Sequence, residues 1–463
     1  MSVGKASPAV LQADIERRLP RALMRGTTAM RAARTAYLPR EPAESAEAYE
    51  VRLNRSFLFN GFGKTVKDMA GKVFAKPIVL SEDMPDTARE YAENIDLAGN
   101  NLDVFAHAVF VDALVDGVSY ILVDMPPPVS GADGEPVERL SRADAAGRRP
   151  WAVHVRASQV LGWQTETVNG ATILTQFRFK ESVSEQTGEF EESLVEQIRV
   201  LSRSADGASW ATYRKSDKGE WLQVDGGPIT IGEIAVTAAY TNAAGFFHGL
   251  PPLSYLAEVN LSHWQSQSDQ KNILHVARVP ILFGAGFNQR EPITISAARM
   301  VTASDPNAKM TYVEHSGAAI ESGRSDLKDL EMQMQALGLD LLKPGPGAQS
   351  ATSAVLDSDR HNSPLAMMAL ALKDSLEGMF GFFAMYDGLA RDTQGGSLTV
   401  NTDYGASWLD GQDVPGLMLA VDKKIITRRT ALSEMKRRGI VSDAVDVDAE
   451  IDAALSEGVD DGF

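Results

Sequence analysis

Three residues with metal-binding side chains, Asp357, Asp359 and His361, lie within five positions of one another. Carboxylate and imidazole groups bind divalent metals and act as general bases, so this group could belong to a metal-dependent intracellular hydrolase. On a helix, however, residues two apart point to different faces, and only Asp357 and His361 share a face, at a spacing of four. Because the sequence offers no third ligand beside them, a solvated helical face is the favoured interpretation and the hydrolase is an alternative.

Other sequence patterns for catalysis and cofactor binding are incomplete. Residues 345–352 precede a helix, as a phosphate-binding loop would, but they lack the Gly-Lys-Ser/Thr ending, and Pro346 removes an N–H group that a phosphate would need. Neither G-x-S-x-G nor H-E-x-x-H occurs, and the absence of cysteine excludes disulfides, thiolate ligands and cysteine nucleophiles. His263 and His275 are too far apart for a metal pair on one helical turn, so they are expected to pack against or cap helices. The sequence therefore predicts a protein that is not an enzyme and binds no cofactor and no metal.

Length and charge restrict the classes of partner. The 463 residues are enough for two or three domains, and no stretch approaches the roughly 20 apolar residues of a membrane span. The formal net charge of −17 argues against a dedicated nucleic-acid-binding protein but is compatible with a surface that DNA slides past. The N-terminus lacks the apolar core of a signal peptide. Its arginines predict a basic helical arm on the surface or on a neighbouring subunit: Arg17, Arg18, Arg21, Arg25, Arg31 and Arg34.

A helix, a stiff break and a longer helix surround the acidic residues and His361. Residues 325–342 place apolar side chains at steps of three and four, with Ser325 as the expected N-cap. The Pro/Gly-rich residues 343–347 end that helix, because proline lacks an N–H group and restricts the residue before it. Helix resumes over residues 352–386, with a kink expected at Pro364. The segment beyond the kink is apolar nearly all round and should be buried.

The chain before these helices mixes helix and strand. The expected elements are helices over 44–74 and 103–116, a strand over 118–124 and a β-rich meander over 151–234. A further helix, from 251 to about 278, turns polar over residues 262–272, so it either bridges solvent or packs beside copies of itself. The remaining expected elements are strands at 280–283, 309–314 and 397–404, helices at 414–421 and 430–438, and an acidic tail over 443–461.

Several of these patterns resemble tailed-phage portal proteins. The order of helix, Pro/Gly loop, kinked helix and strand looks like the portal core, and G-L-P-P-L at 249–253 is similar to the sequence that introduces the first stem helix in portal chains. Y-x-x-R-L at 49–53 and G-x-V-F-x-K-P at 71–77 are similar to one portal subfamily, long catalogued as a phage domain of unknown function. The resemblance extends from Tyr49 to about Glu450.

The resemblance implies an α+β fold of portal type, with a β-rich wing, a two-helix stem with an α/β clip, a long kinked helix and an α-helical crown. The implied boundaries are 1–250 for the wing, 251–278 for the first stem helix, 279–323 for the clip, 324–342 for the second stem helix, 343–350 for the tunnel loop, 351–415 for the long kinked helix and returning wing strand, and 416–463 for the crown.

Two groups of residues would then meet DNA. The tunnel loop, which would project into the channel, contains Lys343, Pro344, Gly345, Pro346, Gly347, Ala348 and Gln349. The basic crown cluster consists of Lys423, Lys424, Arg428, Arg429, Lys436, Arg437 and Arg438. This cluster either touches packaged DNA, pairs with the acidic tail of a neighbouring subunit, or forms ordinary solvated helix faces balanced by the acidic tail.

In function, the resemblance implies a homo-oligomeric ring, commonly of twelve copies, at one capsid vertex, which serves as the channel for DNA packaging and ejection. The implied partners are double-stranded DNA bound without sequence specificity, the terminase large subunit, head–tail adaptors, and major capsid and scaffold proteins, with no membrane. The implied location is the virion, after assembly in the host bacterial cytoplasm. A non-portal head–tail adaptor or minor capsid protein is an alternative, although adaptors are usually much shorter.

Overall fold

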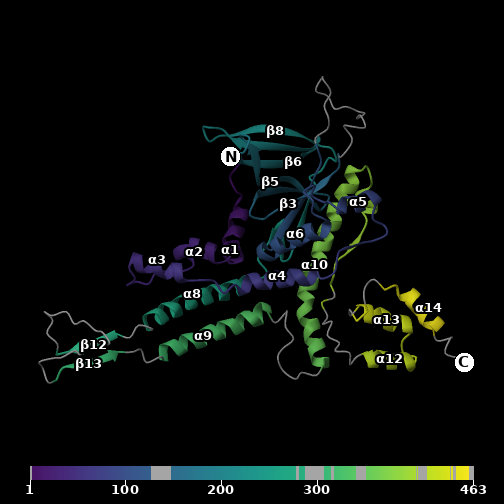
Figure 1. Ribbon diagram of the computed structural model, residues 1–463. Coiled ribbons are helices and arrows are strands. Elements are labelled where there is room, and N and C mark those ends of the chain that lie inside the picture. Colours follow the sequence, from purple (N-terminus) through teal and green to yellow (C-terminus); the bar gives the residue numbers. More distant parts are fainter. Residues whose placement is uncertain are drawn as a thin grey trace.

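The computed structural model describes residues 3–126, 148–277, 281–286, 307–313, 318–339, 351–402, 404, 414–437, 440–441 and 445–457. These residues form an α+β architecture in which helices and two antiparallel sheets make a central body, a pair of helices projects from it, and one long helix crosses it (Figure 1). The mixture of helix and sheet agrees with the broad fold class expected from the sequence.

The first part of the chain is helical. Its elements are α1 (Pro8–Arg25), α2 (Thr27–Ala32), η1 (Arg34–Ala36), α3 (Ala46–Arg55), α4 (Gly61–Val73), α5 (Asp86–Ala92) and α6 (Leu102–Asp116). Residues 44–74, expected as one helix, form two. The backbone leaves the helix at Ser56, whose carbonyl oxygen accepts two hydrogen bonds from Arg31, at 2.9 and 2.7 Å. Asn60 then caps α4 by accepting the Gly63 N–H at 2.7 Å.

Two antiparallel sheets follow. One has the strand order β3-β2-β9, made of β3 (Trp151–Val155), β2 (Val118–Asp124) and β9 (Val236–Tyr240). The other is a meander of β4 (Val160–Val168), β5 (Ala171–Gln186), β6 (Glu192–Ser204), β7 (Gly207–Lys215) and β8 (Trp221–Ile229). The small hairpin after them pairs β10 (Ala243–Gly245) with β11 (His248–Gly249). The predicted β-rich meander is therefore confirmed.

The junction between α6 and β2 is also as expected, and it requires a glycine. Gly117 has a φ of +83°, the left-handed conformation that ends helices. In addition, a Cβ atom at this position would lie 2.1 Å from the carbonyl oxygen of Leu250. Both the backbone angle and the close approach of the chain before α8 therefore exclude a larger residue.

Two large hydrophobic cores and one small cluster (Leu161, Ile198 and Val200) hold the described layers together. The larger core joins the helices and includes Phe62, Phe110, Trp264, Leu372 and Phe383, all of which are at most 1% exposed. The smaller core lies under the sheets and is built around aromatic residues of β2, β5 and the loop before β11. Full burial of each such side chain contributes roughly 1.5–3 kcal/mol.

The projecting helix pair consists of α8 (Ser254–Ala277) and α9 (Ala318–Met334), which continues as a π-helical turn, η2 (Gln335–Leu339). The two helices run antiparallel, and at their far end β12 (Ile281–Ala285) pairs antiparallel with β13 (Lys309–Val313) (Figure 1). The strand pair confirms the expected strands near 280–283 and 309–314. The expected start of the second helix at Ser325 is wrong, because α9 begins at Ala318.

The long helix α10 (Ala351–Tyr386) contains Pro364 within its span, and its side chains are described from Pro364 onward. Beyond Pro364, most apolar residues are buried as predicted, including Leu365, Leu376 and Phe383, whereas Met367 remains 66% exposed. The short α11 (Arg391–Gln394) and β14 (Leu398–Thr399) follow, and β14 pairs with β1 (Val79–Leu80). The strand is therefore much shorter than the predicted 397–404.

Three helices in the part described after residue 413 lie beside the lower half of α10 in Figure 1: α12 (Val414–Asp422), α13 (Arg428–Arg437) and α14 (Val447–Glu457). The first two correspond to predicted helices. α13 begins two residues before the expected 430, at Arg428, and is capped by Thr427, which accepts the Thr430 N–H at 3.1 Å. The segment expected as an acidic tail contains α14, which begins with three acidic residues in or before its first turn: Asp446, Asp448 and Glu450.

Candidate functional site

The first candidate region is the polar seam between α8 and α9. Gln270 of α8 donates through Nε2 to the carbonyl oxygen of Ile320 at 2.8 Å, and Ser266 donates to the carboxylate of Asp326. Gly323 lies opposite Gln270, and a Cβ atom there would stand 2.1 Å from the Gln270 Oε1. The absence of a side chain at Gly323 lets the helices approach, which explains why a Ser-Gly-Arg sequence lies inside α9 instead of preceding it.

His263 contributes the next contact along the seam. Its Nε2 lies 3.5 Å from Glu331 Oε1, its ring centroid is 5.2 Å from that of Phe59, and the side chain is 1% exposed. Burial lowers the pKa of His263, and Glu331 opposes that effect. His275 is exposed near the end of α8. His263 is therefore a packing residue, and nowhere in the described ranges do three or more His, Asp or Glu side chains form a group able to hold a metal.

The opposite face of α8 packs against the N-terminal helices. Ser268 and Ser56 share a hydrogen bond of 2.7 Å, and Gln265 donates to the Tyr37 carbonyl oxygen at 3.0 Å. Asn260 accepts an N–H group from the first turn of α4 at 2.9 Å. The polar run was expected to face solvent or copies of the chain. Instead, much of it is satisfied by the same subunit.

The N-terminal arginines also have a different role from the one expected. Arg17 is 3% exposed and donates to the backbone carbonyl oxygens of Asp116, at 2.9 Å, and Gly249, at 2.7 Å. Arg21 pairs with the Asp116 carboxylate at 2.8 Å and with Asp14. α1 is therefore an integral element that ties α6 to the start of α8, rather than a surface arm. The i, i+4 spacing of Arg17 and Arg21 is the sequence signal for their shared face.

The residues 343–350 predicted as the tunnel loop lie outside the described residues, between Leu339 at the end of η2 and Ala351 at the start of α10. The side chains of Asp357, Asp359 and His361 lie outside them as well. The structure thus brings η2 and α10 to the two ends of the predicted loop, and the predicted roles of these residues stay predictions.

The described part of the crown cluster is only partly paired. Arg429 Nη2 lies 2.7 Å from Asp448 Oδ2 on α14, and Lys436 Nζ donates to the Val445 carbonyl oxygen at 2.8 Å. Lys423, Lys424 and Arg428 are exposed. The Arg437 side chain and the whole of Arg438 lie outside the described residues. Thus the segment after α13 neutralises part of the cluster within one chain.

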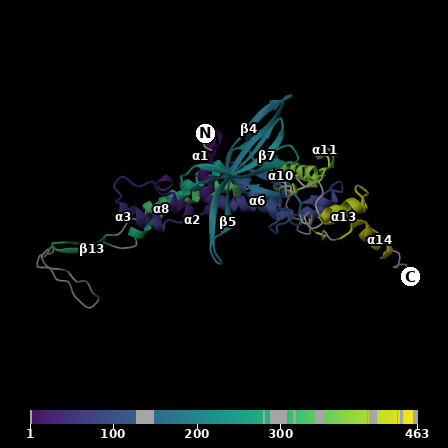
Figure 2. The same ribbon diagram turned by 90° about the horizontal axis from the view of Figure 1, so that it is seen from above.

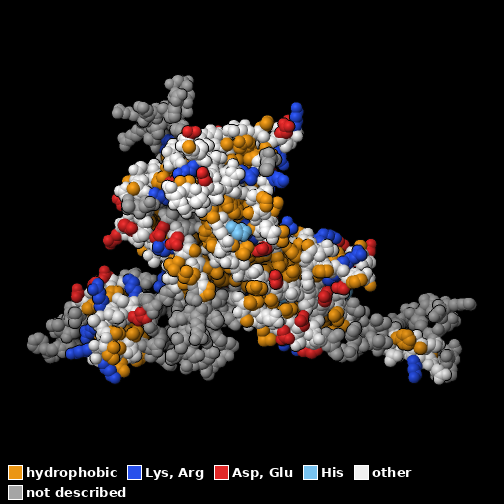
Figure 3. Space-filling model, turned by 180° about the vertical axis from the view of Figure 1, so that it is seen from behind, with side chains coloured by type: hydrophobic (Ala, Val, Ile, Leu, Met, Phe, Trp, Pro, Cys, Tyr) orange, Lys and Arg blue, Asp and Glu red, His pale blue; other side chains and the backbone are white. Residues whose placement is uncertain are grey.

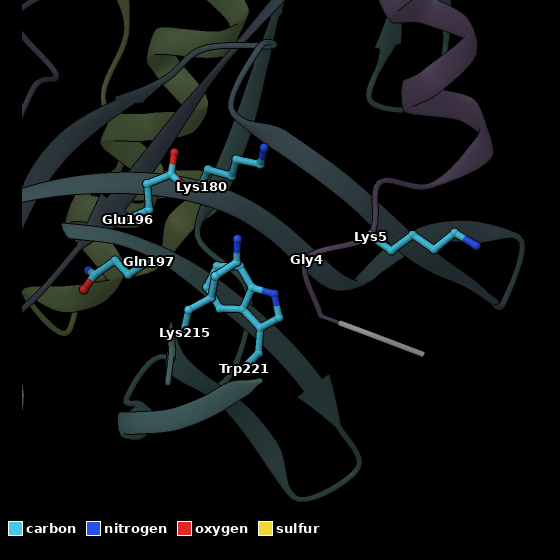
Figure 4. Close-up of a pocket in the computed structure, with 7 residues that line it drawn as sticks. All are labelled: Gly4, Lys5, Lys180, Glu196, Gln197, Lys215 and Trp221. Carbon is cyan, nitrogen blue, oxygen red and sulfur yellow. The ribbon is translucent and has the colours of Figure 1, made fainter. Parts of the chain in front are cut away.

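A small pocket lies on one face of the five-stranded sheet, where the N-terminal segment crosses it. It has a volume of about 320 Å³ and is lined by Gly4, Lys5, Lys180, Glu196, Gln197, Lys215 and Trp221 (Figure 4). Lys215 Nζ lies 5.3 Å from the centre of the Trp221 ring. Gly4 permits the chain to pass this ring, because a Cβ there would be 2.7 Å from the indole nitrogen. An aromatic ring with Lys215 over it and Lys180 in the same lining suits an anionic group with an apolar part.

A wider cleft of about 680 Å³ separates the sheets from α10. Its lining mixes apolar residues of β5 and β9 with Asp374 and Ser375 of α10 and Arg391 of α11. Ser375 Oγ and Thr237 Oγ1 are 3.2 Å apart, and Arg391 pairs with Glu233 at 3.2 Å. The view from behind shows hydrophobic side chains spread over the middle of the molecule (Figure 3). Ser375 and Arg391 therefore have polar partners within the cleft, and no histidine is among the described residues that line it.

Comparison with known proteins gives limited matches. A family profile described as a domain of unknown function (DUF4055) matches residues 252–387, which extend from the start of α8 to the end of α10. This is less than half of the chain. No curated protein matches the sequence.

Three structural matches come from gene transfer agent (GTA) particles. The neck of an empty GTA particle with C6 symmetry gives a TM-score of 0.41 at 12% identity, covering 78% of this chain and 84% of that one. The neck of a native particle with C12 symmetry gives a TM-score of 0.41 at 11% identity, covering 86% of this chain and 95% of that one. The virion of a native particle gives a TM-score of 0.39 at 11% identity, covering 90% of this chain and 96% of that one. Similarities of this size do not by themselves assign a fold or a function.

Proposed function

We propose that this protein is a phage portal subunit that assembles into a ring around a DNA channel. The observation that carries the proposal is the order and arrangement of its central elements. A helix projects from the body, a strand pair follows, a second helix returns antiparallel, and a long helix then crosses the body. If the chain is a portal protein, these elements correspond in order to the first stem helix, the clip, the second stem helix and the long kinked helix.

The projecting helix pair has outward faces that favour contact with further copies. Tyr255 of α8 is 73% exposed, and Met332 and Leu337, on α9 and η2, are 58% and 43% exposed. One face of α8 packs on α9 and another on the N-terminal helices, so these three residues lie on faces that the subunit leaves uncovered, where they remain in water in an isolated subunit. Packing side by side in a ring would bury them. The internal polar seam between the helices would keep the pair rigid while it does so.

The predicted DNA contacts fit this arrangement. Residues 343–350 join η2 to α10, so the second stem helix and the long helix would together hold the tunnel loop at the channel. Lys343 is the one charged residue of that loop, which is compatible with passing contact rather than tight binding of phosphates. The exposed Lys423, Lys424 and Arg428 would face DNA or capsid partners at the crown.

The decisive experiment is the size and shape of the purified protein. We expect negative-stain microscopy to show annular particles with an axial hole, and light scattering to give a multiple of the chain mass of 50.0 kDa, near twelve copies. A dispersed monomer at high protein concentration, also in the presence of capsid and scaffold proteins, would contradict the proposal. Small non-annular oligomers would favour the alternative of a head–tail adaptor or minor capsid protein.

A matched pair of variants tests the helix faces. Met332→Glu places a charge on the outer face of α9, whereas Val168→Glu places one at an exposed site of similar character on β4, where Val168 is 41% exposed. We expect Met332→Glu to lower the ring fraction at least tenfold and Val168→Glu to leave it unchanged. Equal ring fractions in both variants would show that this face of α9 makes no contact between copies.

The tunnel loop requires a test in particle assembly. Deletion of residues 345–348 should leave rings intact and should reduce the DNA packaged per head, because the loop would no longer contact the DNA. Normal DNA-filled heads from the deletion variant would refute the role of the loop without affecting the ring.

A further inference from the structure

The strands β5 and β6 extend well beyond their neighbours. They pair with each other as far as Gln186 and Glu192, whereas the pairing of β4 with β5 stops at Phe179 and the pairing of β7 with β6 begins at Gln197. Residues 181–196 therefore form a two-stranded β-arm that no other described strand flanks on either edge. At roughly 3.4 Å per residue, the paired part from Glu181 to Gln186 extends about 20 Å past the sheet. The arm is visible as the narrow hairpin beside the β5 label in Figure 2.

The end of the β-arm combines an exposed aromatic ring with negative charge. Phe190 is 91% exposed, the highest value among the large apolar residues of the described chain. Glu189 and Glu191 flank it in the turn. Leu194, 77% exposed, lies just below on β6. A two-stranded hairpin is marginally stable alone, and a phenylalanine at its tip contributes nothing to the fold of its own subunit. These properties are those of a segment that docks elsewhere.

The pocket at the base of the same arm has the complementary character. Its lining contains Lys5, Lys180 and Lys215, with Glu196 as the one carboxylate among the described lining residues, so positive charges exceed negative charges there. Lys215 lies over the Trp221 ring, whereas the side chain of Lys5 extends away from it in Figure 4. In Figure 4, the side chains of Lys180, Glu196 and Lys215 extend to one side of the sheet. The volume of about 320 Å³ is large enough for one phenyl ring, which would lie beside the Lys215 ammonium and the indole that this ammonium covers at 5.3 Å. The pocket lies at the low end of the size range of ligand sites.

We propose that the tip of the β-arm of one subunit, Phe190 with Glu189 and Glu191, docks into the pocket formed by Lys5, Lys180, Lys215 and Trp221 of a second copy of this chain. The tip cannot reach its own pocket, because the pocket lies at the base of the extended arm. We propose that each arm docks on the next copy, head-to-tail, and not in a reciprocal exchange between two copies; repetition of such a contact generates a closed ring or a filament. The inference rests on the proposed ring and adds which surfaces join neighbouring subunits.

Chemical cross-linking tests the contact directly, because the chain contains no cysteine. The double variant Glu189→Cys/Lys215→Cys retains Phe190 and is treated with a short bismaleimide. We expect a ladder of covalent multimers in a denaturing gel, because every copy then links to two neighbours. The control Glu166→Cys/Lys215→Cys carries its first cysteine at the opposite end of the sheet and should stay monomeric. A product limited to dimers would overturn the head-to-tail contact, and a ladder equally strong in the control would overturn its specificity.

Charge reversal provides a second test with a rescue. Glu191→Lys and Lys180→Glu should each lower the ring fraction at least fivefold, and the double variant should restore most of it. The arm contact is wrong and the proposed function stands if wild-type rings form, the cysteine variant gives no ladder of multimers, and charge reversal does not lower the ring fraction. If the ladder forms but microscopy shows no annular particle, the arm contact stands and the proposed function is wrong. If neither ladder nor ring forms, both are wrong.

Discussion

Lowering the pH below 6.5 is expected to destabilise the fold at His154, on β3. The imidazole is buried, with its side chain 13% exposed, and its Nε2 lies 2.8 Å from Ser119 Oγ and 3.4 Å from Asp112 Oδ2. Burial lowers the pKa of His154 from 6.5 to about 4, Asp112 opposes this shift and Arg156 adds to it. Burial prevails because the carboxylate of Asp112 is already engaged by Arg156 at 2.8 Å. The ring of Phe105, with its centroid 6.3 Å away, covers the imidazole on another side.

The sign and size of the effect follow from proton binding. Above pH 6.5 the imidazole is neutral in both the folded and the unfolded chain, so it adds no pH dependence. Between pH 6.5 and about 4 the unfolded chain binds a proton that the folded chain does not, so folding stability falls as the pH falls. At 1.36 kcal/mol per unit, the roughly 1.5 units between pH 6.5 and pH 5 lower the free energy of unfolding by about 2 kcal/mol.

The assay compares wild type with His154→Gln, which cannot titrate and can still reach Ser119. We expect urea unfolding at pH 7.5 and pH 5 to show about 2 kcal/mol more acid destabilisation in wild type than in the variant. Nuclear magnetic resonance of histidine labelled at Cε1 should place the midpoint for His154 near pH 4. A midpoint within half a unit of 6.5, or equal acid sensitivity of both proteins, would refute the argument from burial.

Three further variants test contacts within the subunit by urea unfolding. Arg17→Met removes two hydrogen bonds to buried carbonyl oxygens and should lower the free energy of unfolding by about 2–4 kcal/mol. As a control, Arg18→Met changes an exposed residue and should alter the free energy of unfolding by less than about 0.5 kcal/mol. Equal effects of the two variants would contradict the structural role of α1. Gly323→Ala gains up to about 1 kcal/mol of helix propensity but collides with Gln270, so it should be less favourable in wild type than in a Gln270→Ala background by about 1 kcal/mol. Equal effects in the two backgrounds would argue against the close approach of α8 and α9. Arg429→Ala removes an exposed ion pair and should cost less than about 1 kcal/mol, so a larger loss would mean that α13 and α14 depend on it.

Local signals predicted much of the architecture. The order α6, Gly117 and β2 could be predicted because both signals are local. A glycine in the left-handed conformation ends the helix, and a run of β-branched residues favours the strand that follows. The long apolar run predicted α10, and alternating strands predicted the meander. Asp206-Gly207 does separate two strands, whereas Asp225-Gly226, which also reads as a turn, lies inside β8. Element ends were less predictable. α9 continues through Gly323 because the space that this glycine leaves is used by Gln270, which is distant in sequence.

The candidate contact surfaces were the least predictable part. Nothing local distinguishes Phe190 from a core residue, since its exposure depends on where β4 and β7 stop pairing. Lys5 and Trp221 come together only because the N-terminal segment crosses the sheet. The acidic tail was read from its charge, yet its first acidic residues cap α14 and pair with α13.

The sequence by itself determined which stretches are helix or strand, because periodicity, caps and glycine conformations act over a few residues. It also determined that the chain lacks cysteine chemistry and carries excess negative charge. Only the tertiary structure decided which polar residues face each other. Arg17 and the polar run of α8 were expected at surfaces, but buried donors must find acceptors wherever the fold supplies them. Those acceptors lie on α6, before α8 and on the N-terminal helices, far away along the chain.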